Sequence, residues 1–465
     1  MTLDSLGPID AGFLNVEDDA NQMHIGAVLV LGGPPPSFAA LKAMVAGKLG
    51  AIPRYRQVVK RVALDLARPV WVDDPDFDID YHMSHVALPG PGDEVALRRL
   101  VADVMGHRLD RDRPLWEMWM VEGVEQDRWA IIVKVHHCLA DGVGGVELLG
   151  LILDASPDAA PPAPLPWRPA PAPSRLELLV RAVEQAASGS GRLMDTAREA
   201  ASRLDDLARS LPSLLRVVTP AAPTSLNGPI GPHRRWATAT VEISEIKTVR
   251  SALGGSFNDV ALAAITRGFR GLLEKRGESL DHPLRTCVPV SVRPRDERGL
   301  AVGDGTLENK SAAVFADLPV GIGDPVERLR SISAQMDSIK ESNEAEGAYG
   351  AVSLSRFVPH GLAVAAMPFV SRFPQRNVNT VTTNIPGPQI PLYAVGRPLL
   401  AAFPYVPIAM QMRIAVAMLS YNGQLHFGIT GDYDEAPDVD VVAEGIKVGM
   451  DEMLAAAGAP SHTYL

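Results

Sequence analysis

Two consecutive histidines, His136 and His137, are the residues of this sequence with the clearest capacity for chemistry. A neutral imidazole has a pKa of about 6.5, so it can accept a proton near neutral pH. One ring nitrogen can take the proton of a hydroxyl group while a neighbouring group holds the other nitrogen. The pair therefore predicts a general base. Asp141 and Gly142 follow closely, which indicates that a tight turn belongs to the same site.

The two histidines are expected to have different tasks, because neighbouring residues of a strand point to opposite faces of the sheet. Only one of the rings should face a substrate, and the residues alone do not distinguish His136 from His137. Asp141 has three interpretations. It orients a ring, it caps the helix that follows, or it pairs with an arginine and fixes the turn.

The elements around the histidines place them at the end of a strand. The apolar run 129–135 predicts a buried strand, and 143–153 predicts the helix after Asp141. Strand ends in α/β proteins border the crevices that hold ligands. Further elements are predicted earlier in the chain: a strand at 23–32, a helix at 38–49, an edge pair of strands within 54–72, a helix at 95–108 and a strand at 117–122.

Composition excludes several classes of protein. The net charge of −11 argues against a nucleic-acid partner. The two cysteines, Cys138 and Cys287, lie in apolar surroundings and are predicted to be reduced and buried, as in a cytosolic protein. No cysteine cluster predicts a metal site. The first ten residues lack the pattern of a signal peptide, and no apolar run of about 18 residues predicts a membrane span.

The middle of the chain separates two halves. Residues 156–174 are rich in Pro and Ala and predict a surface linker. Between 175 and 211, apolar residues recur at helical spacing with arginines between them. Such a segment can lie in a membrane interface. It can equally form a helical hairpin packed on the protein, which is the favoured interpretation because acidic residues share its polar face.

The second half repeats the alternation of strands and helices. Asn422-Gly423 predicts a hairpin between strands at 410–419 and 424–433. Ser256 and Asp259 have the spacing of a capping box, which would explain Asp259 without a function. No serine has the pattern of a nucleophile elbow, so an acyl-serine is not expected. The remaining predicted elements are strands at 236–243, 284–292 and 377–384 and helices at 260–275, 326–342 and 352–373.

The ordered motifs of the chain resemble those of one family. His136-His137-x-x-x-Asp141-Gly142 is similar to the signature of acyltransferases related to chloramphenicol acetyltransferase and to peptide-synthetase condensation domains. The whole set resembles bacterial wax ester synthase/acyl-CoA:diacylglycerol acyltransferases of the triacylglycerol synthase type. The other motifs are Asp10-Ala11-Gly12-Phe13-Leu14, Pro114-Leu115-Trp116-Glu117, Asn227-Gly228-Pro229-Ile230-Gly231-Pro232, Asn258-Asp259 and Asn384-Ile385-Pro386-Gly387-Pro388.

The resemblance implies an α/β fold of two chloramphenicol acetyltransferase-like domains. Each would be a mixed β-sheet flanked by helices, with the active site at the interface between them. The expected limits are 1–155 for the first domain, which carries the histidine motif, and 236–465 for the second. Residues 156–235 would hold the linker and the amphipathic helices.

The resemblance also assigns roles to single residues. His137 would be the general base, His136 would support the site, and Asp141 with Gly142 would shape the turn, with Arg293 as the expected ion-pair partner of Asp141. Asn258 would donate to the oxyanion. Candidates for substrate binding are Asn384, Ser291 and Thr383, and the interpretation of Asn384 as the start of a turn is favoured. Apart from the resemblance, Ser291 and Thr383 stand at apparent strand ends and could donate to the oxyanion, but the spacing selects neither. Structural roles are expected for Asp259, Pro114 and Trp116.

The implied reaction is transfer of a long-chain acyl group from acyl-CoA to diacylglycerol, and also to fatty alcohols as wax ester formation. No cofactor is expected, because acyl-CoA is a substrate. Two alternatives stay open: a condensation-type enzyme that uses a carrier protein, and a non-catalytic lipid-binding relative. The expected location is the cytoplasm, with the surface of a membrane or lipid droplet as a peripheral partner. The oligomeric state is not predicted.

Overall fold

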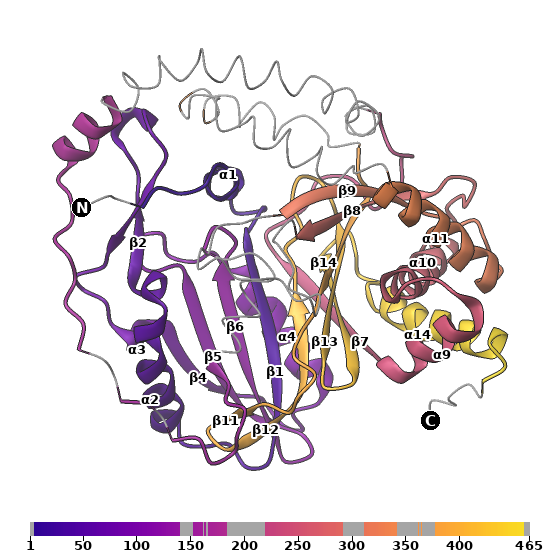
Figure 1. The fold of residues 1–465 in the computed structure, drawn as a ribbon, viewed down its shortest axis with the longest axis horizontal. Coiled ribbons are helices and arrows are strands. Elements are labelled where there is room, and N and C mark those ends of the chain that lie inside the picture. The colour runs from indigo at the N-terminus through magenta and orange to yellow at the C-terminus, as the bar shows by residue number, and fades with distance from the viewer. Residues whose placement is uncertain are drawn as a thin grey trace.

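The computed structural model describes residues 4–139, 152–160, 162–163, 166–183, 219–291, 311–341, 361, 364 and 377–459, and every structural statement below concerns these residues. They form two halves that lie side by side, each built on a sheet of six described strands (Figure 1). Both sheets mix parallel and antiparallel pairs. The expected α/β fold with two mixed sheets is therefore confirmed.

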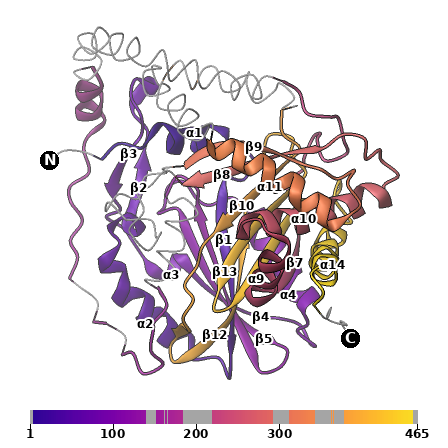
Figure 2. The ribbon, with the colours of Figure 1, turned by 45° about the vertical axis from the view of Figure 1, so that its right-hand side comes forward.

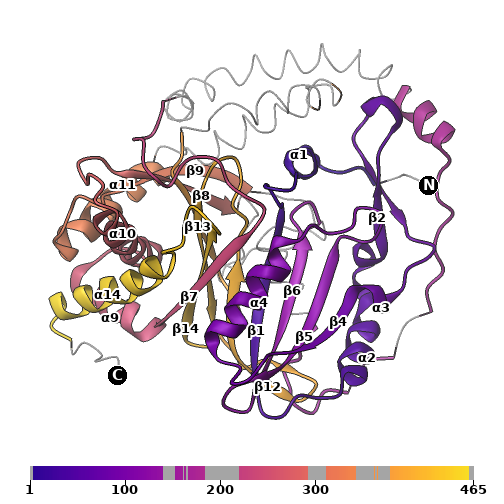
Figure 3. The same ribbon diagram turned by 180° about the vertical axis from the view of Figure 1, so that it is seen from behind.

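The first sheet has the strand order β11-β12-β1-β6-β5-β4. Its central strand β6 is buried on both faces. Trp129, Ile131 and Val133 enter the core that α1 and α2 cover, while Ala130 and Ile132 enter a second core beneath α4 (Figure 3). The described elements of this half are α1 Pro8–Val16, β1 His24–Gly32, α2 Phe38–Lys48, β2 Gln57–Lys60, β3 Val70–Asp73, α3 Ile79–His82, β4 Met83–Ala87, α4 Glu94–Gly106, β5 Trp116–Val124 and β6 Arg128–His136, with short 3-10 turns at Leu49–Ala51, Pro53–Arg56 and Ala63–Asp65.

The second sheet has the order β7-β14-β13-β10-β8-β9. Helices α9, α10, α11 and α14 cover one of its faces (Figure 2). The predicted hairpin is confirmed, with Asn422 and Gly423 both at positive φ in the turn. The elements are β7 Arg234–Glu242, α9 Ile243–Leu253, α10 Phe257–Lys275, β8 Leu284–Ser291, β9 Ser311–Leu318, α11 Pro325–Glu341, β10 Thr380–Ile385, β11 Tyr393–Ala394, β12 Arg397–Tyr405, β13 Ile414–Tyr421, β14 Gln424–Asp432 and α14 Asp440–Ala456.

Strands β11 and β12 belong by sequence to the second half, yet they complete the sheet of the first half. Strand β12 pairs antiparallel with β1, so that Tyr405 lies opposite Gly26. The domain limits at 155 and 235 stay a prediction. Because β11 and β12 follow residue 235 but pair in the first sheet, the two sheets do not correspond to two continuous stretches of the chain. Two prolines, Pro398 and Pro404, interrupt the strand pattern of this segment, because proline lacks the amide donor of a regular ladder.

The two sheets touch where β12 lies against β14. The ring of Phe403 packs edge-on against His426, with 4.9 Å between ring centroids. The two backbones come close together at Gly428, where a Cβ atom would lie only 1.8 Å from the carbonyl oxygen of Pro404. Glycine is thus required at this point, and the halves are held in direct backbone contact.

The segment around residue 175 shows two unlike faces. The described residues 166–174 form no helix or strand, as expected of a linker, and 175–183 are helical. Leu178 packs against the β2–β3 hairpin, and Ala182 is also buried. The periodic apolar residues Leu176, Val180 and Val183 are exposed instead. The helix 175–183 therefore packs on the rest of the protein through a different face from the one that the periodic apolar residues indicated. Residues 184–211 lie outside the described residues.

Several predictions concern residues that the structure does not describe: the helices at 143–153 and 352–373, and most of the amphipathic segment. Cys138 is buried, as predicted, while Cys287 is only partly buried. Among the described helices, none is both long and apolar enough to cross a bilayer.

Candidate active site

The histidine motif begins where β6 ends, as the sequence predicts. The His136 amide donates to the Leu115 carbonyl at 3.0 Å, and the His137 amide donates to the Met23 carbonyl at 2.8 Å. Neighbouring strands therefore hold the backbone of both histidines. The two side chains differ sharply in access, since His136 has no exposed surface whereas His137 is partly exposed.

The ring of His136 has a polar neighbour at each nitrogen, but a hydrogen bond only at Nδ1. Its Nδ1 accepts the Cys138 amide at 3.0 Å, so the ring proton lies on Nε2. That nitrogen lies 3.4 Å from Oε1 of Glu17. Burial is the main cause that lowers the pKa of His136, which keeps the ring neutral at pH 7. The His136 ring is thus fully buried, with one hydrogen bond and one polar contact to Glu17.

Glu17 follows α1 and is buried beneath the histidines. Its carboxylate pairs with Arg111, with 2.6 Å between Oε2 and the guanidinium nitrogen, and accepts the Met23 amide at 3.4 Å. Burial by itself would raise the pKa of Glu17, but interactions with His136 and Arg111 outweigh it and lower that pKa. Arg111 at 2.6 Å and Arg108 at 3.6 Å are the guanidinium groups beside this carboxylate.

His137 projects on the other side of the turn, towards α1. Its ring stacks on Phe13, with 4.0 Å between ring centroids and 21° between the planes. Helix α1 lies over the end of the first sheet, on the side where the second half begins (Figures 1 and 3). The partly exposed imidazole therefore has one face against an aromatic ring and is the more accessible of the two histidines.

The structure brings Asn258 and Asn384 together. Asn258 lies in the first turn of α10, Asn384 lies in β10, and the Asn384 amide nitrogen donates to the Asn258 side-chain oxygen at 3.2 Å. Both side chains are half-buried. Asn384 is the next-to-last residue of β10, close to where the predicted strand ends, and its interpretation as the start of a turn stays a prediction.

Asp259 and Trp116 have structural contacts. The carboxylate of Asp259 accepts the Ser256 amide at 2.7 Å and the Ser256 hydroxyl accepts the Asp259 amide at 3.2 Å, which confirms the capping box. The indole of Trp116 donates to the Tyr55 carbonyl at 2.8 Å and stacks on His82. Pro114 is buried in the turn before β5.

The remaining predicted residues are placed only in part. Thr383 is a half-buried residue within β10, not at its end. Ser291 is the last residue of β8, and its side chain is outside the described structure. Asp141, Gly142 and Arg293 also lie outside it. The proposed ion pair between Asp141 and Arg293 therefore stays a prediction.

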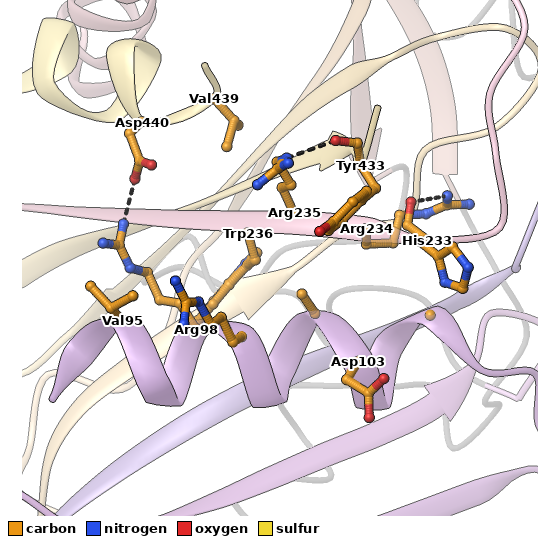
Figure 4. Close-up of a pocket in the computed structure, with 13 residues that line it drawn as sticks. Val95, Arg98, Asp103, His233, Arg234, Arg235, Trp236, Tyr433, Val439 and Asp440 are labelled. Carbon is orange, nitrogen blue, oxygen red and sulfur yellow. Dashed lines mark hydrogen bonds and ion pairs between the residues drawn. The ribbon is translucent and has the colours of Figure 1, made fainter. Parts of the chain in front are cut away.

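A cleft of about 680 Å³ runs along α4, between this helix and β7 (Figure 4). Arg98 spans it to reach Asp440 at 2.5 Å, and Arg235 lies over the Tyr433 ring. None of the predicted site residues is among the described residues that line it. The side chain of Gln22 donates to the carbonyl of Gly106, which lines the cleft, and to that of Pro232.

Sequence reasoning missed Glu17 and gave Phe13 no role. Phe13 was part of a motif whose purpose was unassigned, and Glu17 stands four residues later. Helix α1 was not predicted, and Glu17 is the residue that ends it. An acid shortly after the motif Asp10 to Leu14 is the signal that could have drawn attention to this segment.

Two mixed sheets with a partly exposed histidine after a buried one define a class of acyltransferase-like folds. Solved structures share the architecture. A wax ester synthase/diacylglycerol acyltransferase from Marinobacter aquaeolei has a TM-score of 0.69 at 24% identity, covering 98% of this chain and 100% of that one. The starter condensation domain of rhizomide synthetase, in a complex with C8-CoA, has a TM-score of 0.60 at 15% identity, covering 99% and 96%.

Sequence comparisons identify the family to which the chain belongs within this fold class. Residues 6–261 match the wax ester synthase/diacylglycerol acyltransferase catalytic domain, and 307–454 match the C-terminal domain of the same family. A probable diacylglycerol O-acyltransferase of Mycobacterium tuberculosis is 37% identical over 97% of this chain and 96% of its own length. A putative one of Mycobacterium bovis has the same identity and coverage. The chain belongs to the wax ester synthase/diacylglycerol acyltransferase family, and it is an acyltransferase.

Proposed function

We propose that this protein transfers a long-chain acyl group from acyl-CoA to diacylglycerol and forms triacylglycerol, with fatty alcohols as a second class of acceptor. The observation that carries this proposal is the contrast between the two histidines: His136 is buried and bonded, while His137 is partly exposed at the end of β6. The family and the names of its relatives support the choice of substrates.

In the proposed mechanism, His137 removes the hydroxyl proton of the alcohol as its oxygen attacks the thioester carbonyl. A tetrahedral adduct forms with a negative charge on the former carbonyl oxygen. The adduct then collapses, the bond from carbon to sulfur breaks, and His137 returns the proton to the CoA thiolate. The acyl group moves directly between substrates, so the reaction needs no cofactor and no covalent enzyme intermediate.

Asn258 is the proposed donor to the oxyanion. Because its side-chain oxygen accepts a hydrogen bond from Asn384, the orientation of its amide is fixed. The two hydrogens of the Asn258 amide nitrogen then point away from Asn384. A donor that is oriented before the reaction stabilises developing charge without reorganisation. Among the described contacts none selects Thr383 for this role, and the side chain of Ser291 lies outside the described structure.

The test is to incubate the purified protein with labelled palmitoyl-CoA and either diacylglycerol or hexadecanol, and to separate the products by thin-layer chromatography. Triacylglycerol or wax ester is the expected product. Transfer only from an acyl group on a carrier protein would indicate the condensation-type alternative. Binding of lipid without any product would indicate a non-catalytic relative.

We also propose a lipid surface as a peripheral partner, because the acceptor substrates dissolve in lipid. The candidate contact is an apolar patch of Leu64, Leu66, Leu176, Val180 and Val183, all exposed. Leu64 is 85% exposed, and Leu176 is 69% exposed. The helix 175–183 lies beside the tip of the β2–β3 hairpin in all three views (Figures 1, 2 and 3).

Two further features support this patch. Leu64 has φ 58°, a left-handed conformation that is uncommon for leucine and places its side chain outward. The patch is bordered by the exposed cations Lys60, Arg61, Arg175 and Arg181, with Asp65 and Glu177 as the acids beside them. An apolar surface with a basic border suits anionic lipid, and it contrasts with the net charge of −11 of the whole chain.

A further inference from the structure

We infer that α1 is the element that positions the base: Phe13 holds one face of the His137 ring, and Glu17 anchors the turn that carries it. Neither residue reacts, so both are positioning residues. The inference rests on the proposed function, because it assumes that His137 is the base. It adds two residues that act on the reaction through their contacts with the histidine motif.

The first contact is the stack between Phe13 and His137. At 4.0 Å between centroids and 21° between planes, the two rings are in face-to-face van der Waals contact. A ring covered in this way cannot turn freely about its side-chain torsions. Phe13 is itself held by α1, whose residues Ala11 and Leu14 are buried in the core of the first half. The stack therefore limits the directions in which the His137 nitrogens can point.

The second contact is made by Glu17, whose carboxylate lies beside both the His136 ring and the Met23 amide. Oε1 lies 3.4 Å from Nε2 of His136 and 3.4 Å from the Met23 amide nitrogen. The carbonyl of Met23 in turn accepts the His137 amide at 2.8 Å. The Glu17 carboxylate thus contacts the side chain of His136 and the backbone of Met23, and Met23 in turn pairs with His137.

Arg111 joins these two contacts into one unit. Its guanidinium donates to Oε2 of Glu17 and also to the Leu14 carbonyl at 2.8 Å, which is the last turn of α1. The helix end and the carboxylate are therefore held from the same point. Arg108 lies 3.6 Å from Glu17 and also acts on this cluster, while Asp10 within α1 acts on the neighbouring Cys138.

Small errors of position are costly for a base. A displacement of about 1 Å can lower the rate of a reaction by about a hundredfold. Loss of either contact should therefore lower kcat while the KM for acyl-CoA changes little, because the contacts are made to His137 and not to the substrate. A purely structural role would instead lower the amount of folded protein and leave the kcat of the folded fraction unchanged.

The first experiment replaces Phe13. Phe13→Leu keeps an apolar side chain but loses the aromatic face, and we expect kcat to fall about tenfold with the KM for acyl-CoA unchanged. Phe13→Tyr keeps the ring and should retain kcat. The matched control is Phe38→Leu, because Phe38 stacks on the exposed His85, with 5.1 Å between centroids. That variant should keep the wild-type kcat.

The second experiment observes the ring without any substrate. With histidine labelled by ¹³C and ¹⁵N, the His137 signal is identified as the one that is missing in His137→Ala. In Phe13→Leu the Cε1–H resonance should move downfield, since the ring above it is gone. In Glu17→Gln the His137 resonance should also move, because the carboxylate that contacts the Met23 amide and His136 is lost. The acidic limb of the pH profile of kcat/KM should move to lower pH, since a negative charge beside the histidine motif is removed.

Unchanged kcat in folded Phe13→Leu, together with an unmoved His137 resonance, would overturn the inference. So would a Glu17→Gln protein whose folded fraction keeps the wild-type kcat and pH profile. A failure of the proposed function has a different signature. In that case the wild type makes no acyl ester, or His137→Ala keeps full activity, while the resonance of His137 still responds to Phe13 and Glu17.

Discussion

The side-chain amide of Asn384 donates to the side-chain oxygen of Asn258, with 3.2 Å between the two atoms. This bond joins the end of β10 to the first turn of α10, although the residues are 126 positions apart in the sequence. The capping box of Ser256 and Asp259 fixes the same helix end from the other side. Asn258 is thus oriented by two independent constraints, which is the condition for a preorganised donor.

We predict that Asn258→Ala lowers kcat by about 10²-fold or more, the range for loss of an oxyanion donor. Asn384→Ala should lower kcat less, because the amide of Asn258 remains but is no longer oriented. The double variant should be no worse than Asn258→Ala, since the two residues act as one unit. Steady-state kinetics at saturating acyl-CoA measure all three. Independent, multiplicative losses would contradict this arrangement.

The chain offers a matched control for this experiment. Asn379 donates to the side-chain oxygen of Asn227 at 2.8 Å, a second asparagine pair in the same half. Asn227 lies opposite Met412 and has no proposed role in the reaction. Asn227→Ala should lower the free energy of unfolding by about 1 kcal/mol without a change in kcat.

The two histidines should respond differently to replacement. His137→Ala is expected to lose at least about 10²-fold in kcat while its unfolding midpoint stays close to that of the wild type. His136→Ala should be destabilised by about 1–3 kcal/mol, because the Cys138 amide and Glu17 lose their buried partner. Urea unfolding and kinetics on the same preparations separate the two effects. A soluble, folded His137→Ala with full activity would exclude the proposed base.

Local patterns predicted much of the fold. The run into His136 was a buried strand, the Asn422-Gly423 turn closed a hairpin, and Ser256 with Asp259 capped α10. Each of these features is determined by residues close together in the sequence, so it could be predicted from the local pattern. Strand β12 could not be placed in this way, because its partner β1 is more than 300 residues away and its two prolines hide the strand pattern.

The candidate site was predictable to a similar extent. The histidine motif was found directly, whereas the bond between Asn258 and Asn384 depends on how α10 meets the second sheet. Glu17 was missed because an isolated glutamate is ordinarily a solvated surface residue. Its function in the cluster arises from Arg111, which comes from a distant turn after α4. Contacts of this kind become visible only with the tertiary structure.

The exposed apolar patch makes a prediction about lipid binding. Replacing Leu64, Leu176 and Val180 with Ser removes apolar area from the proposed contact, so binding to liposomes that contain anionic phospholipid should fall by about tenfold or more. Flotation on a density gradient measures the bound fraction. Leu400→Ser is the control, since Leu400 is an exposed leucine of β12 outside the patch. Unchanged binding by the triple variant would exclude this surface.

Acidic pH should destabilise the protein through buried histidines. Burial lowers the pKa of His426 to about 4, from an ordinary value of 6.5. Between these values the unfolded chain binds a proton that the folded chain does not, so stability falls as the pH is lowered from 6.5 to 4. The difference corresponds to roughly 3 kcal/mol for this group.

Burial also lowers the pKa of His24, His82 and His136, so these groups act in the same direction. Urea unfolding measured across this pH range tests the prediction. In His426→Phe the slope of stability against pH should be smaller, because residue 426 no longer titrates. An equal slope in both proteins would show that His426 does not contribute.

Gly428 sets the contact between the two halves. We predict that Gly428→Ala lowers the free energy of unfolding by about 3 kcal/mol or prevents folding, because the new Cβ would overlap the Pro404 carbonyl. Gly254→Ala is the comparison, since a Cβ there meets no atom within 4 Å, although its φ of 87° adds strain. Thermal unfolding of both variants measures the difference. Equal midpoints would contradict the close approach.

The place of β12 has a consequence for how the chain is made. During synthesis β1 is made early and β12 late. The edge of β1 that pairs with β12 therefore has no partner until Tyr405 has been synthesised. Such an edge can recruit the same strand of another nascent chain. Cells that produce this protein in quantity would therefore need to shield the newborn first half, and any fragment that stops before Arg397 should accumulate as aggregate.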